Sequence, residues 1–565
     1  MPTLDGKAIR MGSVYLAAIF CATILLTAGG VLGDEIKWNN TAGGSFNLDT
    51  NWNPVQVPDA DDTAVFDLAQ TPAYDVTFNA GITNDRCHFR TDEVNMYLNG
   101  YTYILLGVND YSLVVGESSP DLACVVMTGG TLQTRSAHVG LYASSIGILD
   151  VVGADMTMNI DEWLTVGEDG AGGLGISEGA TVTSRRFHAG ALNSGSNSTV
   201  YITGPDSSLT VTGEFFAVGD SGSASMRIDA GATARTTHAG GWIRAGSQAG
   251  SYGEIIVEND SLLDAESSPM IIGDWGKGSL TVAAISTAHS AGELFVAGSE
   301  GSSGDVLITA ESEYVSDSVY ISKIGDAGTG TLIIEDMSRF QGYSMVVGNR
   351  PTGDGTVTLY DSGSTLEVDY LRVGREGAGR LEVNDGRVAM GDVDPSTVPD
   401  GEVHIGVGGE LGGTGTIACK VLNIAGEVRP GGTILPTRIP GILNIDGDFE
   451  QHADGTLVIE IGGTSRGDEY SVLDVSGEFT IGGALISEAI NGYDPQLGDT
   501  FDILDWVTST GEFDTIWLPP TPVVDWWWDT SMLYRTGEIT VVPEPATLML
   551  LGIGGLPALR SRKRG

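Results

Sequence analysis

An apolar residue followed directly by glycine recurs along the middle of the chain, and this repeat constrains the fold more than any other feature of the sequence. From Leu113 onward, successive pairs are mostly 23 to 29 residues apart. The pairs are Val115-Gly116, Val139-Gly140, Val166-Gly167, Ala189-Gly190, Val218-Gly219, Ala245-Gly246, Ile272-Gly273, Ala297-Gly298, Ile324-Gly325, Val347-Gly348, Val373-Gly374 and Ile405-Gly406. A repeat at this spacing indicates a chain built from stacked units.

Between these pairs, Gly-rich turns separate short segments in which apolar and polar residues alternate, such as residues 278–282 and 330–334. This alternation predicts strands that bury one face, and a unit of this length cannot bury that face alone. Stacking the units about 4.8 Å apart solves the problem. We therefore predict an all-β protein whose residues 109–411 form a parallel β-helix, or β-solenoid, in which twelve turns make a rod of about 60 Å. A propeller is the alternative, but its repeats would be longer, at about 40 residues.

The segments on both sides of the repeats are expected to be capping β regions. Residues 34–108 contain Trp38, Trp52, Pro54 and Pro58, and this segment resembles the N-terminal entry of large surface proteins that bear autotransporter-like repeats. The open end of a solenoid exposes unpaired strand edges, so these bulky residues are expected to cover it.

The second flank covers residues 412–542 and has a different pattern of glycine and proline residues. It contains Gly412-Gly413, Pro430-Gly431-Gly432 and Pro440-Gly441, followed by the alternating residues 455–461. This succession resembles the region that closes the passenger repeats in autotransporter-associated and planctomycete-type surface proteins. The resemblance implies a C-terminal β region that ends the solenoid.

The first 33 residues have the order of a secretory signal peptide. Lys7 and Arg10 precede an apolar stretch over residues 14–26, and small residues follow up to Gly33. The apolar stretch is short for a membrane span, which needs roughly 20 residues. We predict cleavage after Gly33, with Gly29 and Gly30 as alternative positions.

Residues 543–565 combine three parts in a fixed order. Pro543-Glu544-Pro545 precede an apolar segment over residues 548–559. A basic cluster follows, made of Arg560, Arg562, Lys563 and Arg564. The positive charges favour the cytoplasmic side of a membrane, so this segment is expected to hold the chain transiently at the inner membrane, as a short transmembrane helix would.

This terminus resembles the PEP-CTERM sorting signal. The resemblance implies recognition by an exosortase-type membrane protease in a bacterium that makes exopolysaccharide, with removal of the tail on export. The sequence therefore predicts an exported structural or adhesive protein of the cell surface, outer envelope or extracellular matrix. Its expected partners are exopolysaccharide or other envelope components.

The chain is strongly acidic, with 74 Asp and Glu against 28 Lys and Arg and a net charge of −46. Such a surface repels nucleic acid, because binding to phosphates requires cations. It favours solubility and leaves weak, scattered Ca²⁺ binding open. No ligand spacing typical of a metal site occurs, so we predict neither a metal site nor a cofactor.

Because parallel β-helices also carry polysaccharide lyases and glycosidases, acidic pairs are the candidate catalytic groups. The nearest candidates are Asp161 with Glu162, Asp317 with Glu311 and Glu313, and Asp392 with Asp394. None of them has a neighbouring Arg or Lys in the sequence of the kind a lyase uses. We predict that the protein is not an enzyme, and a β-helix carbohydrate-active enzyme is the alternative.

Histidine and tryptophan give two further patterns. His88, His138, His188, His238 and His289 are 50 or 51 residues apart, which predicts one histidine on every second turn, in a solvated or capping surface ladder. The run Trp526-Trp527-Trp528 predicts a terminal strand with Trp527 facing outward and a hairpin over residues 533–539. The alternative is a carbohydrate-binding surface protein that stacks its exposed aromatics on sugars.

Overall fold

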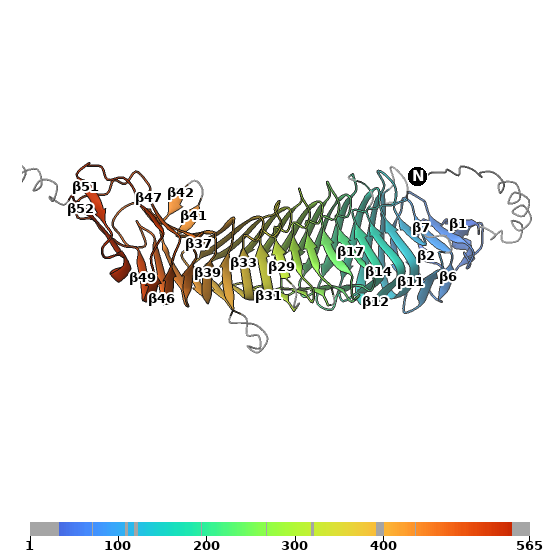
Figure 1. The fold of residues 1–565 in the computed structure, drawn as a ribbon. Coiled ribbons are helices and arrows are strands. Elements are labelled where there is room, and N and C mark those ends of the chain that lie inside the picture. Colours follow the sequence, from blue (N-terminus) through green and yellow to red (C-terminus); the bar gives the residue numbers. More distant parts are fainter. Residues whose placement is uncertain are drawn as a thin grey trace, which may run out of the picture.

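The structure is a computed structural model, and it describes residues 33–544 except 70–71, 108–110, 118–121, 192, 194, 267, 318–320, 391–400 and 435–436. The chain is nearly all β and winds into a parallel β-solenoid of about 17 turns, which confirms the predicted fold class. Figure 1 shows a rod with its N-terminal turns in blue and its C-terminal turns in red at opposite ends. Stacking about 17 turns at about 4.8 Å gives a length of about 80 Å.

Each turn contributes strands to three parallel sheets, which we call the first, second and third sheet in their order along one turn. The first sheet contains β2 (Gly44–Ser45), β5 (Tyr74–Thr77), β8 (Glu93–Tyr97), β13 (Ala171–Ser177), β15 (Asn197–Thr203), β18 (Ser223–Asp229), β21 (Tyr252–Val257), β24 (Lys277–Val282), β27 (Ser303–Ile308), β30 (Thr329–Ile334), β32 (Asp354–Tyr360), β34 (Ala378–Asn384), β37 (Gly409–Gly413), β40 (Glu427–Pro430), β45 (Thr456–Ile461), β47 (Ala484–Ala489) and β50 (Thr515–Trp517). The second sheet contains β6 (Ile82–Asn84), β9 (Thr102–Leu105), β16 (Ser208–Val211), β19 (Thr233–Thr236), β22 (Leu262–Ala265), β25 (Thr287–Ser290), β28 (Glu313–Ser316), β35 (Arg387–Ala389), β38 (Thr416–Ala418) and β43 (Ile442–Ile445).

The third sheet contains β1 (Glu35–Trp38), β4 (Thr63–Phe66), β7 (Arg86–Phe89), β10 (Leu113–Val115), β17 (Phe215–Val218), β20 (Trp242–Ala245), β23 (Met270–Ile272), β26 (Leu294–Val296), β29 (Ile321–Ile324), β36 (Glu402–Ile405), β39 (Lys420–Asn423) and β44 (Phe449–Gln451). Longer strands bend from one sheet into the next. They are β11 (Leu122–Val139) and β12 (Ile146–Val166), which run through all three sheets, and β14 (Thr181–Ala189), β31 (Arg339–Val347), β33 (Thr365–Val373), β46 (Val472–Ile481) and β49 (Leu504–Gly511), which join the second to the third.

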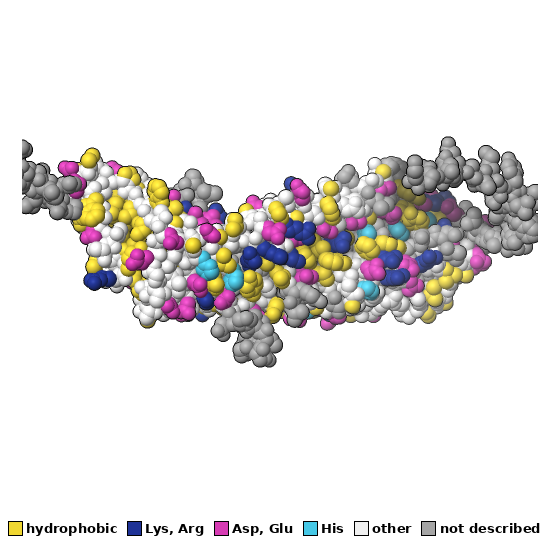
Figure 2. All heavy atoms as spheres, in the orientation of Figure 1, with side chains coloured by type: hydrophobic (Ala, Val, Ile, Leu, Met, Phe, Trp, Pro, Cys, Tyr) yellow, Lys and Arg dark blue, Asp and Glu magenta, His cyan; other side chains and the backbone are white. Residues whose placement is uncertain are grey.

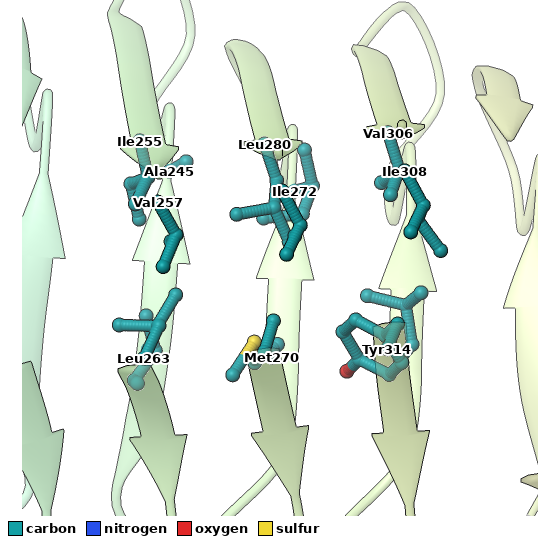
Figure 3. Packing of buried hydrophobic residues seen from close by; sticks show 14 of the residues in the cluster. Ala245, Ile255, Val257, Leu263, Met270, Ile272, Leu280, Val306, Ile308 and Tyr314 are labelled. Atoms are coloured by element: carbon teal, nitrogen blue, oxygen red, sulfur yellow. The ribbon is translucent and has the colours of Figure 1, made fainter. Parts of the chain in front are cut away.

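The core is built from ladders of equivalent apolar side chains. Ile255, Leu280 and Val306 lie in register on successive strands of the first sheet. Each is at most 1% exposed, and Figure 3 shows them pointing into the space between the sheets, toward Met270 and Tyr314. Burying one such side chain contributes about 2 kcal/mol. The alternation seen in the sequence is therefore the alternation between core and surface.

The repeat glycine marks the corner between the third and first sheets. Gly273 has φ of 74°, a left-handed conformation that glycine adopts without strain. A Cβ on Gly278, in the following strand, would lie 2.2 Å from the backbone nitrogen of Gly273, so no side chain fits there. In one turn the sequence alignment of the repeats was wrong by one residue. Ala297, with φ of 59°, takes the corner position in place of Gly298, because Val296 pairs with Ile324.

Aromatic residues close the N-terminal end of the rod. Strand β1 pairs in parallel with β4 and in antiparallel with β3 (Trp52–Asn53), after a short 3-10 helix at Asp49–Asn51. The rings of Trp38 and Trp52 are 5.0 Å apart and each side chain is 1% exposed. Trp38 stacks on Phe66 and Trp52 meets Phe46 edge to face, and these phenylalanines continue into the core. The parallel ladders thus begin well before Leu113.

The C-terminal end continues the same three sheets as far as β49 and β50 and then changes direction. A small antiparallel pair, β41 (Gly432–Ile434) and β42 (Thr437–Ile439), is inserted on the way. An antiparallel sheet of β48 (Thr500–Asp502), β51 (Trp526–Asp529) and β52 (Glu538–Pro543) covers the last turn. The short helix α1 (Leu533–Thr536) connects β51 to β52, where the sequence predicted continuous hairpin strand.

Candidate functional site

The outer face of the third sheet carries a ladder that explains the spacing of three histidines. His88 pairs with Val114, and Val114 pairs with His138 on the next strand. The same ladder continues through Thr165 to His188. One histidine on every second turn is therefore confirmed for these three residues.

These histidines are paired with carboxylates. The sequence predicted solvated or capping side chains, but they are largely buried. His88 and His138 are each 7% exposed. His88 Nδ1 lies 3.4 Å from Glu117 Oε2, and His138 Nδ1 lies 2.5 Å from Glu168 Oε2. Each glutamate directly follows the repeat glycine of the next turn. Each histidine–glutamate pair therefore joins two neighbouring turns.

The same two-turn pattern continues with other residues farther along the rod. His188 Nδ1 lies 3.5 Å from Asp220 Oδ2, and burial lowers the pKa of His188 although Asp220 opposes this shift. Arg244 occupies the equivalent position two turns later and lies 3.5 Å from Asp274. A histidine or arginine on one turn and an acidic side chain on the next thus form a row of paired side chains.

The last two histidines of the predicted ladder lie elsewhere. His238 is in the bend between β19 and β20. His289 is on the second sheet, where its two ring nitrogens lie 2.7 Å from Asp264 and 2.8 Å from Asp317. Burial lowers the pKa of His289, but the hydrogen bonds to both aspartates outweigh it and raise the pKa above its ordinary value. The prediction that all five histidines occupy equivalent positions is wrong for these two, because the turns differ in length and equal sequence spacing does not give equal positions.

Two hollows open on the outer face of the third sheet. The first, of about 260 Å³, is lined by Tyr111, His138, Trp163, Thr165, Glu168, His188 and Ala191. The second, of about 310 Å³, is lined by Glu214, Phe215, His238, Ala239, Gly240, Trp242 and Arg244. They adjoin where the ring of His188 lies 5.6 Å from the ring of Phe215.

Aromatic and basic side chains gather along this face. Arg186 lies 4.7 Å from the ring centre of Trp163, Arg244 lies 5.3 Å from that of Trp242, and Lys323 lies 4.1 Å from that of Phe295. Figure 2 shows dark-blue basic side chains over the middle of the rod, with yellow apolar side chains beside them. These residues were not predicted from the sequence, although most of them stand two or four positions before a repeat glycine, where side chains of the third sheet point outward.

The acidic pairs considered for catalysis are not brought together as a catalytic pair. Glu162 lies 3.1 Å from Arg185 and 3.5 Å from Arg186, so it does have basic neighbours, contrary to the sequence-based view. Asp317 pairs with His289 instead of with Glu311 or Glu313. Asp392 and Asp394 lie outside the described residues. In the described ranges, no group of three or more His, Cys, Asp and Glu side chains is arranged to hold a metal ion.

The described chain ends inside the proposed sorting motif. Pro543 is the last residue of β52 and pairs with Trp526, and the Glu544 N–H donates to the Asp525 carbonyl at 2.7 Å. Trp527 is 46% exposed and faces outward as predicted, while the Trp528 ring lies 5.7 Å from that of Phe501. Gly33 is the first described residue, and Pro545, Arg560, Arg562, Lys563 and Arg564 lie outside the described part.

Within the described part of the chain, no helix has both the length and the apolar character needed to span a membrane. Comparison with known proteins leaves the family open. No protein-family model matches the chain, and no curated protein matches it.

Proposed function

We propose that the protein is an exported structural or adhesive component of a bacterial cell surface or extracellular matrix. In this proposal, the signal peptide over residues 1–33 directs export, and an exosortase-type protease processes the chain at Pro543-Glu544-Pro545. The observation that carries the proposal is the order of that motif, the apolar segment 548–559 and the basic cluster within the last 23 residues.

The architecture supports this function. A rod of about 80 Å with a continuous apolar core and an acidic surface is a stiff spacer that stays soluble. Its C-terminal antiparallel sheet ends at Pro543, directly before the segment that would be removed. Processing at the motif would therefore leave the folded rod intact. Exopolysaccharide, divalent cations or neighbouring copies would be its partners.

The test is the mass and location of the protein in its native host. Wild type is compared with Glu544→Ala, with a deletion of residues 546–565, and with Glu512→Ala as a control at an exposed carboxylate of the same end. We expect wild type and Glu512→Ala outside the inner membrane without the tail, and the other two variants altered in processing and location. An exported wild-type chain that keeps its tail would contradict the proposal.

A second candidate function, carbohydrate binding, is favoured by the two hollows on the third sheet. Each hollow has one carboxylate among its described lining residues, Glu168 in the first and Glu214 in the second. A glycosidase uses a pair of carboxylates on opposite sides of one bond. The hollows therefore favour binding over hydrolysis.

A further inference from the structure

The two hollows and the rings between them form one continuous track on the third sheet. The Trp163 ring lies 6.2 Å from that of Phe215, and Phe215 pairs with Trp242 on the next strand. The Trp242 ring lies 6.3 Å from that of Phe295. From β12 to β26 the track crosses five strand spacings, or about 24 Å along the rod axis. A ligand that fills it must be elongated.

The rings along the track are partly open to solvent. Phe215 is 40% exposed, and Trp163, Trp242 and Phe295 are half-buried. Packing between the sheets does not require them, because they point away from the core. Flat rings spaced along an open face offer a large apolar area at low entropic cost, which suits stacking on the faces of sugar rings.

Several buried polar atoms along the track have no partner among the described residues. They are Nε2 of His188, Nδ1 of His238, and Nε of Arg186 and Arg244. His188 lines the first hollow, and His238 and Arg244 line the second. Buried polar groups are almost always hydrogen-bonded in native proteins. Because these four atoms are themselves buried, a sugar hydroxyl, which both donates and accepts, can pair with one of them only if that side chain shifts outward.

Arginine and histidine side chains on the track are already paired with carboxylates of the protein. Arg186 lies 3.5 Å from Glu162, His188 lies 3.5 Å from Asp220, and Arg244 lies 3.5 Å from Asp274. The chain as a whole carries −46, so a polyanion would be repelled before it reached the track. Paired charges instead provide fixed donors and acceptors for a neutral ligand.

From these observations we infer that the outer face of the third sheet binds an uncharged polysaccharide, which lies along the rod axis and stacks on Trp163, Phe215 and Trp242. The inference rests on the proposed function in one respect, because an exported protein meets such a polymer outside the cell. It names the ligand class of the proposed adhesive role.

The test is affinity electrophoresis and calorimetry of the full chain with soluble uncharged glucans, xylans, mannans and galactans, and with polygalacturonate as the charged polymer. Binding is measured at about 20 mM and about 500 mM NaCl, which differ strongly in charge screening. We expect at least one uncharged polymer to bind with an affinity that changes less than about twofold with salt. Binding of polygalacturonate alone, lost at high salt, would overturn the inference, as would no binding at all.

Matched variants locate the site. Trp242→Ala and Phe215→Ala are expected to weaken binding about tenfold or more, as loss of a central aromatic anchor does. Trp242→Tyr keeps a ring and should retain most of the affinity, and thermal unfolding of each variant shows whether the solenoid is intact. Trp527→Ala, in the C-terminal sheet, is the control and should bind normally. Loss in Trp527→Ala with normal binding in Trp242→Ala would place the site elsewhere and overturn the inference. These measurements use purified protein, so they are independent of whether the sorting experiment succeeds.

Discussion

His138 Nδ1 lies 2.5 Å from Oε2 of Glu168, which belongs to the next turn of the solenoid. The histidine is on the outer face of the third sheet and is 7% exposed, and Glu168 lies in the turn that follows β12. The pair shows why the chemistry of this face repeats every two turns while the backbone repeats every turn. A basic group needs one acidic neighbour, and the neighbouring turn supplies it.

The hydrogen bonds that Glu117 accepts from His88 and Arg90 should make the free energy of unfolding depend on pH in the acid range. Burial raises the pKa of Glu117, but hydrogen bonds from His88 and Arg90 outweigh it and lower the pKa to about 2. The carboxylate therefore contributes stability above its unfolded pKa of about 4.3, and this contribution is lost as the pH falls toward about 2. With screening by solvent at this half-buried group, we expect about 1–2 kcal/mol.

The check is urea unfolding of wild type and Glu117→Gln at several pH values. Glu117→Gln should be less stable than wild type at pH 6, and the difference should shrink as the pH approaches 2. A difference that stays constant across this range would show that Glu117 acts through packing alone.

His289 should make the stability depend on pH in the opposite direction, so that stability falls as the pH rises. Its pKa is raised by Asp264 and Asp317, so its contribution is complete below the unfolded pKa of about 6.5 and is lost as the pH rises through the higher folded value. We expect wild type to lose more stability than His289→Gln between pH 6 and pH 9, measured by thermal unfolding. Asp317→Asn removes one of the two partners and should give an intermediate loss; a loss equal to that of wild type would exclude Asp317 as a source of the shift.

Gly278→Ala should strongly destabilise its corner of the solenoid. The added Cβ would lie 2.2 Å from the Gly273 nitrogen and 2.5 Å from the Ala245 carbonyl oxygen, and neither backbone atom can move without disturbing a neighbouring turn. We expect a cost of about 3 kcal/mol or more, as for overpacking in a core. Gly250→Ala is the control. Gly250 has φ of 85° but nothing within 4 Å, so only backbone strain of about 1–2 kcal/mol applies.

Leu280→Ala should lower the stability of the solenoid turns around residue 280. Leu280 is 1% exposed and stacks between Ile255 and Val306, so the cavity should cost about 2–5 kcal/mol. In a solenoid each turn contacts mainly its neighbours. Hydrogen exchange should therefore accelerate most in β21, β24 and β27 and little in β45 or β47. Uniform acceleration along the whole rod would show that the solenoid opens as one cooperative unit.

The fold was predictable because it depends on local patterns. Alternation such as that in residues 278–282 predicts the strand β24, and Gly273 predicts the corner before it. The position of Trp527 on an outward-facing strand followed from the same rule. The register of the repeats was less predictable where Ala297 replaces glycine, because an alanine in the sequence does not indicate a left-handed backbone conformation.

The track on the third sheet was not predictable in the same way. Trp163, Phe215 and Trp242 each stand four positions before a repeat glycine, but the sequence does not show which of their rings meet, since the intervening loops differ in length. The spacing of His88, His138 and His188 did indicate a shared position, but it also suggested His238 and His289, which lie elsewhere.

The sequence by itself determined that this chain is a β-solenoid, since periodic alternation and corner glycines act within one turn and need no distant partner. Only the tertiary structure decided which outward side chains meet. Parallel stacking places residues about 25 positions apart within about 4.8 Å of one another, and small changes in loop length decide which residue occupies each place. The contacts of His138 with Glu168 and of Arg244 with Asp274 depend on that register, and so does the aromatic track.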